Sequence, residues 1–338
     1  MKKHEVTILT NQGKIDLECT KLIQIKSWRF PTPKYAFMPG LIKFVNSGKL
    51  NDYDIIHIFE YPIFVADFLT LNKKKIKPPL ILSFHASLHQ QTKFPLNIFK
   101  KIHHFIMLKY SWRISTFIAS TVAEKSHVLK YGIEDSKVQI LPLGVNYTPV
   151  DRTNISGKRI LYVGLLGITK NIDLLIKAFS LCDNKELELI LAGPDYGMLK
   201  NLKMLVKKLK IEKRVSFRGR VSEEEKTQLF SNATIFVHPS MQDIFSLTLI
   251  EAAAAGIPSI AFDVEANSEI LDHMNTGMIA KKLTPESLKE TIELLLKNKD
   301  LYEKISNNAK KLIPQKYNWD NTVNCLEEYY HNTILKNN

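Results

Sequence analysis

The sequence predicts an α/β protein made of two doubly wound, Rossmann-like domains that face a central cleft. Its 338 residues exceed what one hydrophobic core usually supports. Continuous apolar runs of strand length alternate with segments of helical periodicity, which is typical of parallel sheets covered by helices on both faces. This alternation stops near the middle of the chain and then starts again, so we expect two domains rather than one.

In the first half, the strand-like runs are apolar and bounded by turn residues or helical segments. We expect strands at 4–10, 53–59, 79–85, 116–120 and 137–144, with helices at 61–73, 96–112 and 121–131.

A linker near 144–157 separates the halves, after which the same rhythm resumes. Strands are expected at 159–164, 187–193, 214–219, 234–240 and 258–262. The predicted domains are 1–148 and 149–318, and residues 319–338 form a C-terminal helix expected to pack back toward the first domain. Ser222 and Glu225 have the spacing of a capping box at a helix start.

The positive charge is concentrated in one half of the chain. The formal net charge is +13; residues 1–150 hold 21 Lys+Arg against 10 Asp+Glu, which gives +11 and leaves +2 for the rest. An anionic membrane surface or an acidic acceptor would suit the first domain, and a solvated lysine-rich surface explains the charge equally well. A nucleic-acid partner is not expected, because no recognised motif or aromatic-basic platform accompanies the charge.

Targeting segments and paired cysteines are both missing from the pattern. No apolar run approaches the roughly 20 residues of a membrane span, and the first residues do not resemble a signal peptide, so we expect a cytoplasmic protein that can dock on the inner face of the membrane. Cys19, Cys182 and Cys325 are far apart, which favours buried, unpaired thiols over disulfides or zinc.

Asp52-Tyr53-Asp54 imitates a metal-binding DxD motif, but its position before a buried strand favours a turn. No metal or cofactor is expected.

Two acids stand near one predicted helix in "DIFSLTLIEAAAAGIPS", residues 243 to 259. Asp243 lies in the loop after a strand, and the helix is expected to start near Ser246 and end at Gly256. Ligands of doubly wound sheets bind at the carboxyl ends of strands, and helix N-termini bind phosphate. Glu251 inside the apolar helix could accept both hydroxyls of a ribose; its alternative role is an ion pair with a buried Lys or Arg.

A second stretch, "RILYVGLLGITKNIDLLIKAF", places a lysine beside another strand end. The strand runs into Gly164, and Lys170 precedes a helix predicted at about 171–181. Neither a dinucleotide fingerprint nor a P-loop is present. A cation at a helix start opposes the helix dipole unless an anion binds there, so Lys170 is a candidate phosphate ligand.

Together these motifs resemble the family 4 retaining glycosyltransferases, which have the GT-B fold. The likeness covers nearly the whole chain and includes the Asp243 to Glu251 spacing, "GIPSIAF", the "YVG…K" strand and "IASTVAEKSHVLKYGIEDSKVQILPLGVN". It implies a hexosyltransferase that moves a sugar from a nucleotide-diphosphate sugar to a lipid-linked or saccharide acceptor, with retained configuration and without a metal. Cell-surface polysaccharide or glycolipid synthesis is the implied context.

The resemblance also implies a role for each matching residue. Glu251 matches the acid that binds the ribose, Asp243 the acid near the transferred sugar, and Lys170 the lysine that steadies the diphosphate. The catalytic candidates are His85, Lys170 and Asp243, and the donor-binding candidates are Gly164, Lys170, Asp243, Phe245, Ser246, Leu247 and Glu251.

This chain departs from the family pattern at several positions. The family usually has Glu at 243, Arg at 165 and a glycine pair at 265 and 266, where this chain has Asp243, Leu165, Glu265 and Ala266. The strand at 4–10 resembles the family's second strand, so the first strand and its glycine-rich loop are expected to be missing.

Two other functions fit the same architecture. A catalytically weak or silent GT-B-like subunit would bind the nucleotide sugar without transferring it, and Leu165 is consistent with that. A sugar-nucleotide epimerase would turn over the nucleotide sugar without an acceptor. Separately, residues 94–113 read either as an ordinary amphipathic domain helix or as an interfacial helix that attracts anionic lipid.

Overall fold

The computed structural model describes two compact units of the chain. The described residues are 4–10, 20–25, 27–31, 36–60, 63–84, 109–147, 150, 158–264, 266–273 and 275–337. The first unit comprises Met1–Ala119, Lys125–Ile140 and Leu326–Asn338, and the second comprises Ser120–Glu124 and Leu141–Cys325. The first unit therefore includes the C-terminal segment of the chain, and the second includes the short segment Ser120–Glu124.

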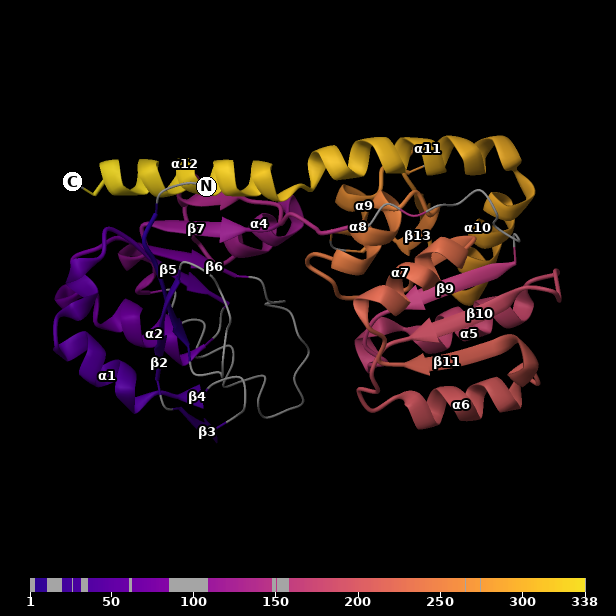
Figure 1. The fold of residues 1–338 in the computed structure, drawn as a ribbon, viewed down its shortest axis with the longest axis horizontal. Helices are drawn as coiled ribbons and strands as arrows, with labels where there is room; N and C mark the ends of the chain where they lie inside the picture. The colour runs from indigo at the N-terminus through magenta and orange to yellow at the C-terminus, as the bar shows by residue number, and fades with distance from the viewer. Residues whose placement is uncertain are drawn as a thin grey trace. The chain divides into compact units, whose positions relative to one another are not determined.

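The first unit is built around a parallel sheet with strand order β5-β6-β7-β8 (Figure 1). Its two central strands are buried along their whole length, as their continuous apolar sequence predicts. β1 pairs in parallel with β2, and β3 pairs with β4 in antiparallel fashion. The strands are β1 (Val6–Thr10), β2 (Thr20–Gln24), β3 (Trp28–Pro31), β4 (Ala36–Phe37), β5 (Ile56–Phe59), β6 (Leu80–Ser83), β7 (Thr116–Ala119) and β8 (Val138–Ile140).

Short helices cover one face of this sheet. Leu41 of α1 and Leu69 of α2 share a buried cluster with Leu82 and Phe117 from the strands. The predicted helix at 96–112 lies mostly outside the described residues, which include only a 3-10 turn at its end. The helical elements are α1 (Pro39–Asn46), η1 (Lys49–Asp52), α2 (Phe64–Leu71), η2 (Lys73–Lys75), η3 (Ser111–Arg113), α4 (Val122–Leu129) and η4 (Asp135–Lys137).

The last helix, α12 (Trp319–Leu335), ends on the first unit. The Thr333 and Thr116 hydroxyls are 2.7 Å apart, and Tyr330 Oη lies 2.7 Å from His57 Nδ1. Polar contacts therefore fix the end of α12 on the sheet.

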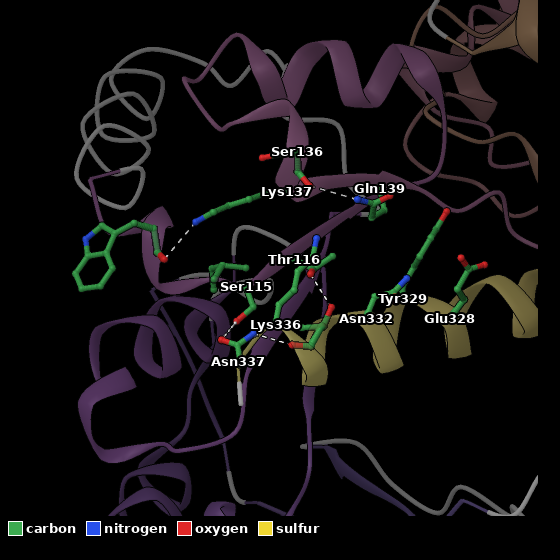
Figure 2. Close-up of a pocket in the computed structure, with 13 residues that line it drawn as sticks. Ser115, Thr116, Ser136, Lys137, Gln139, Glu328, Tyr329, Asn332, Lys336 and Asn337 are labelled. Atoms are coloured by element: carbon green, nitrogen blue, oxygen red, sulfur yellow. Dashed lines mark hydrogen bonds between the residues drawn. The ribbon is translucent and has the colours of Figure 1, made fainter.

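A polar hollow of about 440 Å³ lies between the end of α12 and strands β7 and β8 (Figure 2). Hydrogen bonds across it join Ser115 to Asn337 (3.2 Å) and the Tyr329 hydroxyl to the carbonyl of Ile140 (2.9 Å). Ser115 and Lys137 precede β7 and β8, so the hollow opens at the amino ends of these strands. In parallel α/β sheets, ligands bind at the opposite, carboxyl ends. We therefore assign its lining to the attachment of α12.

The second unit contains a six-stranded, all-parallel sheet with strand order β11-β10-β9-β12-β13-β14 (Figure 1). The chain runs from β9 outward to β11 on one side and then returns to place β12 on the other side of β9. The strand order thus reverses between β9 and β12. The strands are β9 (Arg159–Val163), β10 (Glu188–Ala192), β11 (Val215–Gly219), β12 (Ile235–His238), β13 (Ser259–Phe262) and β14 (Met278–Ala280).

Alternate residues of these strands enter two separate cores. Ile160 and Tyr162 of β9 pack in one core with α5, α6 and α10, whereas Leu161 and Val163 pack in the other with α7 and α8. This two-residue period places helices on both faces, which makes the sheet doubly wound. The helical elements are η5 (Ile168–Lys170), α5 (Ile172–Leu181), α6 (Leu199–Lys208), η6 (Glu212–Arg214), α7 (Glu223–Asn232), α8 (Leu247–Ala254), α9 (Asn267–Ile270), α10 (Pro285–Lys297) and α11 (Lys299–Lys316).

Helix ends in this unit follow the sequence signals. The predicted capping box is present: the Glu225 amide donates to Ser222 Oγ, and the Ser222 amide donates to Glu225 Oε2. Ser246 is the N-cap of α8, and Gly256, with φ of 74°, follows its end. The sequence thus located both ends of the helix that carries Glu251.

The segment before β9 is tied to the start of α12 within the second unit. The Val145 amide donates to the Tyr317 carbonyl (3.2 Å), and Thr322 Oγ1 donates to the Pro142 carbonyl (2.9 Å). A Cβ added at Gly144 would lie 2.5 Å from the backbone nitrogen of Trp319. Glycine is therefore needed where the predicted linker starts.

The cysteine prediction is partly wrong. Cys182 is a buried, free thiol, but Cys325, in α12, is exposed, and Cys19 lies outside the described residues. In the part of the chain that is described, no helix has the length and apolar character of a membrane span.

Candidate functional site

The candidate site lies where the strand order of the second sheet reverses. β9 leads into the loop that contains Gly164 and Lys170, and the neighbouring β12 leads into the loop that contains Asp243. The two loops are joined directly, because the Met241 amide donates to the Thr169 carbonyl at 3.1 Å. Such a reversal point is where doubly wound sheets bind ligands.

Lys170 and Asp243 meet in this site. Lys170 Nζ lies 2.6 Å from Asp243 Oδ2, and each side chain is 19% exposed. His238 Nε2, at the end of β12, lies 2.8 Å from the same Oδ2 and 3.1 Å from Ser246 Oγ. A cation, a carboxylate, an imidazole and a hydroxyl therefore form one connected cluster at the start of α8.

The cluster keeps the Asp243 carboxylate ionised. Burial alone would raise its pKa, but the hydrogen bonds and charges of His238 and Lys170 outweigh burial and lower the pKa to about 2. Both partners contact Oδ2, and no described residue bonds Oδ1. Asp243 thus has one oxygen held in place and a second available to a ligand.

Crowding by the Tyr162 side chain explains the glycine at 164. A Cβ at Gly164 would lie 2.7 Å from the Tyr162 hydroxyl, which donates to the Leu165 carbonyl at 2.9 Å. A Cβ at Gly193, after β10, would lie 1.8 Å from the Gly164 carbonyl oxygen. The two glycines let the loops after β9 and β10 touch, which fixes the start of the loop that carries Lys170.

Glu251 has an internal cationic partner. Its Oε2 lies 3.0 Å from Lys226 Nζ, and both side chains are mostly buried, at 15% and 14% exposure. Burial raises the pKa of Glu251, and the hydrogen bond and charge of Lys226 partly offset that rise. The ion pair that the sequence left open as an alternative is therefore present, and it accounts for the buried charge without a ligand.

The residues at the start of α8 differ in accessibility. Phe245 packs edge-on against Tyr317, with ring centroids 5.6 Å apart, and Ser246 is buried. Leu247, the first residue of the helix, is exposed. No side chain among the described residues caps this N-terminus, so none of them prevents its first amides from binding an anion.

The structure brings together most, but not all, of the predicted site. Lys170, Asp243 and Ser246 share the cluster, Gly164 precedes Lys170 in its loop, and Glu251 lies one turn into α8. His85 lies outside the described residues, as does Glu265, and Ala266 is buried.

Sequence reasoning missed two side chains that contact the predicted acids. His238 lies two residues before the end of the predicted strand "TIFVHPS" and is the last residue of the observed strand β12; its position near a strand end was the available signal. Lys226 lies in α7, on the helix whose capping box was recognised, but nothing in the spacing linked it to Glu251.

The DxD-like segment has the structure of a turn. Asp52 ends η1, and Tyr53 and Asp54 form the bend before β5. Across the described ranges, no group of three or more His, Cys, Asp or Glu side chains is arranged to hold a metal ion.

Comparisons with known proteins agree with this architecture. Residues 151–312 match the glycosyl transferases group 1 family, and residues 1–148 match Glycosyltransferase Family 4. The two matches together show that the chain belongs to the family 4 glycosyltransferases, and its fold is GT-B.

Individual relatives are distant. An uncharacterized glycosyltransferase of Methanocaldococcus jannaschii is 28% identical over 82% of this chain and 76% of its own length. Mannosylfructose-phosphate synthase of Agrobacterium fabrum is 26% identical over 78% of this chain and 65% of its own length. Among solved structures, Anabaena HepE in complex with UDP and glucose has a TM-score of 0.75 and 18% identity, covering 92% of this chain and 86% of that one.

Proposed function

We propose that this protein transfers a hexose from a nucleoside diphosphate sugar to a saccharide or lipid-linked acceptor, with retention of the anomeric configuration. The observation that carries the proposal is the Lys170–Asp243 ion pair at the reversal point of the second sheet, beside the uncapped start of α8. A cation and free helix amides suit a diphosphate, and an ionised carboxylate suits sugar hydroxyls.

The donor is proposed to bind along α8. The diphosphate would contact the amides of Ser246 and Leu247 and the ammonium of Lys170, and the ribose hydroxyls would bond Glu251. Leu247 and Glu251 are four residues apart, which is about one helical turn or roughly 6 Å along the helix axis, and this suits a ribose joined to a diphosphate. The UDP complex of the Anabaena protein supports a nucleoside diphosphate as the ligand class.

In the proposed reaction, the bond between the sugar C1 and the diphosphate oxygen breaks while the acceptor oxygen bonds to C1 from the same face. The acceptor hydroxyl gives its proton to the departing diphosphate. Lys170 and the α8 amides stabilise the charge that grows on the leaving group. Asp243 orients the transferred sugar through Oδ1, while His238 and Lys170 hold Oδ2.

The proposed acceptor side is the first unit, whose sequence range carries most of the positive charge. An anionic membrane surface would concentrate a lipid-linked acceptor near this unit. Sedimentation with liposomes tests the membrane part: we expect binding to anionic vesicles and little to neutral ones. Equal binding to both would remove the electrostatic contribution.

The reaction is tested by incubating the protein with UDP-, GDP- and ADP-hexoses, with and without a panel of saccharide and polyprenyl-phosphate acceptors. We expect nucleoside diphosphate release that depends on an acceptor, and NMR of the product should show the donor's anomeric configuration. Turnover without acceptor would instead indicate an epimerase or a hydrolase.

A catalytically silent binding subunit is the second candidate, because Leu165 replaces a cation of the family's diphosphate site. Binding of a nucleoside diphosphate with no turnover of any donor across the acceptor panel would favour it.

A further inference from the structure

We infer that Lys226 is a positioning residue for the donor's ribose: it holds the Glu251 carboxylate in the orientation that selects ribonucleotides over 2′-deoxyribonucleotides. The inference rests on the proposed function and deepens it, because it assigns sugar selectivity to a residue outside the family's acid pair.

Lys226 and Glu251 form an ion pair through one carboxylate oxygen. Lys226 Nζ bonds Glu251 Oε2 at 3.0 Å, and the carboxylate makes no other polar contact with a described residue. The other carboxylate oxygen of Glu251, Oε1, is not fully buried. One oxygen is therefore fixed by the lysine while the other still reaches solvent.

Lys226 is held in the hydrogen-bonded first turn of α7. Its amide donates to the Ser222 carbonyl in the first turn of α7, which the Ser222–Glu225 capping box fixes. α7 is anchored by Phe230, which meets Phe236 of β12 with centroids 6.1 Å apart. The lysine is thus presented from an anchored turn onto the same core that buries α8.

Lys226 contacts two acids that differ in exposure, Glu223 and Glu251. Glu223 Oε2 lies 2.8 Å from Lys226 Nζ, but the Glu223 side chain is 83% exposed. Solvent screens an exposed pair, whereas a mostly buried pair is screened much less. Glu251 is therefore the partner whose charge and orientation depend on Lys226.

The orientation of the Glu251 carboxylate affects how well it binds a vicinal diol such as that of ribose. A carboxylate binds two neighbouring hydroxyls well only when it is ionised and its plane is fixed. Without Lys226, a carboxylate in this buried position would be desolvated with no counter-charge, which favours its neutral form. The neutral, freely rotating group would discriminate poorly between ribose and 2′-deoxyribose.

The test compares binding of a nucleoside diphosphate and its 2′-deoxy analogue by isothermal titration calorimetry, using the full-length protein. UDP and 2′-deoxy-UDP are the first pair, followed by the guanine and adenine pairs. We expect the unmodified protein to prefer the ribonucleotide by about 10-fold, the effect of one charge-assisted hydrogen bond. Lys226→Met should reduce the preference to about 2-fold, and Lys226→Arg should restore most of it.

Lys177→Met is the matched control. Lys177 pairs with Asp173 at 2.9 Å in α5, on an exposed surface away from Glu251, so its loss should leave the preference unchanged. Circular dichroism melting of each variant shows whether Lys226→Met is folded. If that variant is unfolded, Lys226→Gln and Lys226→Arg provide the comparison.

The outcomes separate the inference from the proposed function. If no nucleoside diphosphate binds the unmodified protein, or if it shows no ribose preference, the assignment of Glu251 fails and the inference fails with it. If the unmodified protein prefers ribose and folded Lys226 variants keep the full preference, only the role of Lys226 is wrong.

Discussion

Lys170 Nζ and Asp243 Oδ2 are 2.6 Å apart, so the lysine that we assign to the diphosphate is bound to the acid that we assign to the transferred sugar. The two residues are 73 positions apart in sequence and come from the loops after neighbouring strands. Their contact makes the position of one charge depend on the other.

The first prediction concerns this lysine. Lys170→Ala should lower kcat about 100-fold and change donor affinity less than 10-fold, because the leaving diphosphate carries more charge in the transition state than in the bound donor. Steady-state kinetics together with donor titrations measure both effects. Lys177→Ala, which removes another partly exposed lysine, is the control. A loss of donor affinity with unchanged kcat would place Lys170 in ground-state binding only.

Glu251→Ala should weaken nucleoside diphosphate binding about 10- to 100-fold, because it removes the acceptor for the ribose hydroxyls. Calorimetric titration with the preferred diphosphate measures the change. Glu223→Ala removes the exposed partner of the same lysine and should bind normally. Unaltered affinity in Glu251→Ala would leave the carboxylate with only its ion-pair role.

The stability of the site should depend on pH through Asp243. Its pKa is lowered to about 2, below the ordinary value, so its contribution to stability is present above the unfolded pKa and is lost as pH falls toward the folded pKa. Asp243→Asn should cost about 2 kcal/mol at neutral pH, and the difference should shrink between about pH 4 and pH 2. Thermal unfolding of the unmodified protein and of Asp243→Asn, from neutral pH down to about pH 2, measures this difference in stability. A difference that stays constant with pH would exclude the ionised pair as its source.

Gly193→Ala should be strongly destabilising, by more than about 3 kcal/mol, because φ is 144° and the new Cβ would lie 1.8 Å from the Gly164 carbonyl oxygen. Gly197→Ala is the control: its φ is 90°, but no atom lies within 4 Å of the new Cβ. Denaturant unfolding of both variants should separate crowding from backbone strain. Equal losses of stability in Gly193→Ala and Gly197→Ala would show that the positive φ alone, and not the contact with the Gly164 carbonyl, causes the destabilisation.

Much of the fold could be predicted from the sequence because buried parallel strands are continuous apolar runs. The runs at β6, β7, β9, β10 and β12 each coincide with an observed strand. Short or edge elements were harder: α1 has eight residues and no side-chain cap, and β2 gives no long apolar run. Their position depends on tertiary packing more than on local pattern.

The candidate site was predictable only in part, for a similar reason. Asp243, Glu251 and Lys170 stand out because charges interrupt apolar sequence near strand or helix ends. Lys226 and His238 act through contacts across 25 and 5 positions, and nothing in a single sequence shows which acid a lysine will meet. The exposed position of Cys325 was missed because the usual burial of cysteine does not show which face of a helix the residue occupies.

Leu165→Arg should restore the cation that the family pattern has at this position. Leu165 is 43% exposed, so an arginine can extend from the loop without entering the core. We expect donor affinity or turnover to rise several-fold, since a second cation would meet the diphosphate. Leu165→Met is the control for side-chain volume. A fall in activity with normal folding would mean that the leucine itself contacts the substrate.

The central claim is that the start of α8, with Lys170 and Glu251, binds a nucleoside diphosphate. Thermal-shift titration with UDP, GDP and ADP tests it most directly, because a ligand that binds only the folded protein raises Tm with concentration. We predict that at least one of the three stabilises the protein, and that Glu251→Ala needs a higher concentration for the same shift. No stabilisation by any of them, up to about 1 mM, would contradict the claim.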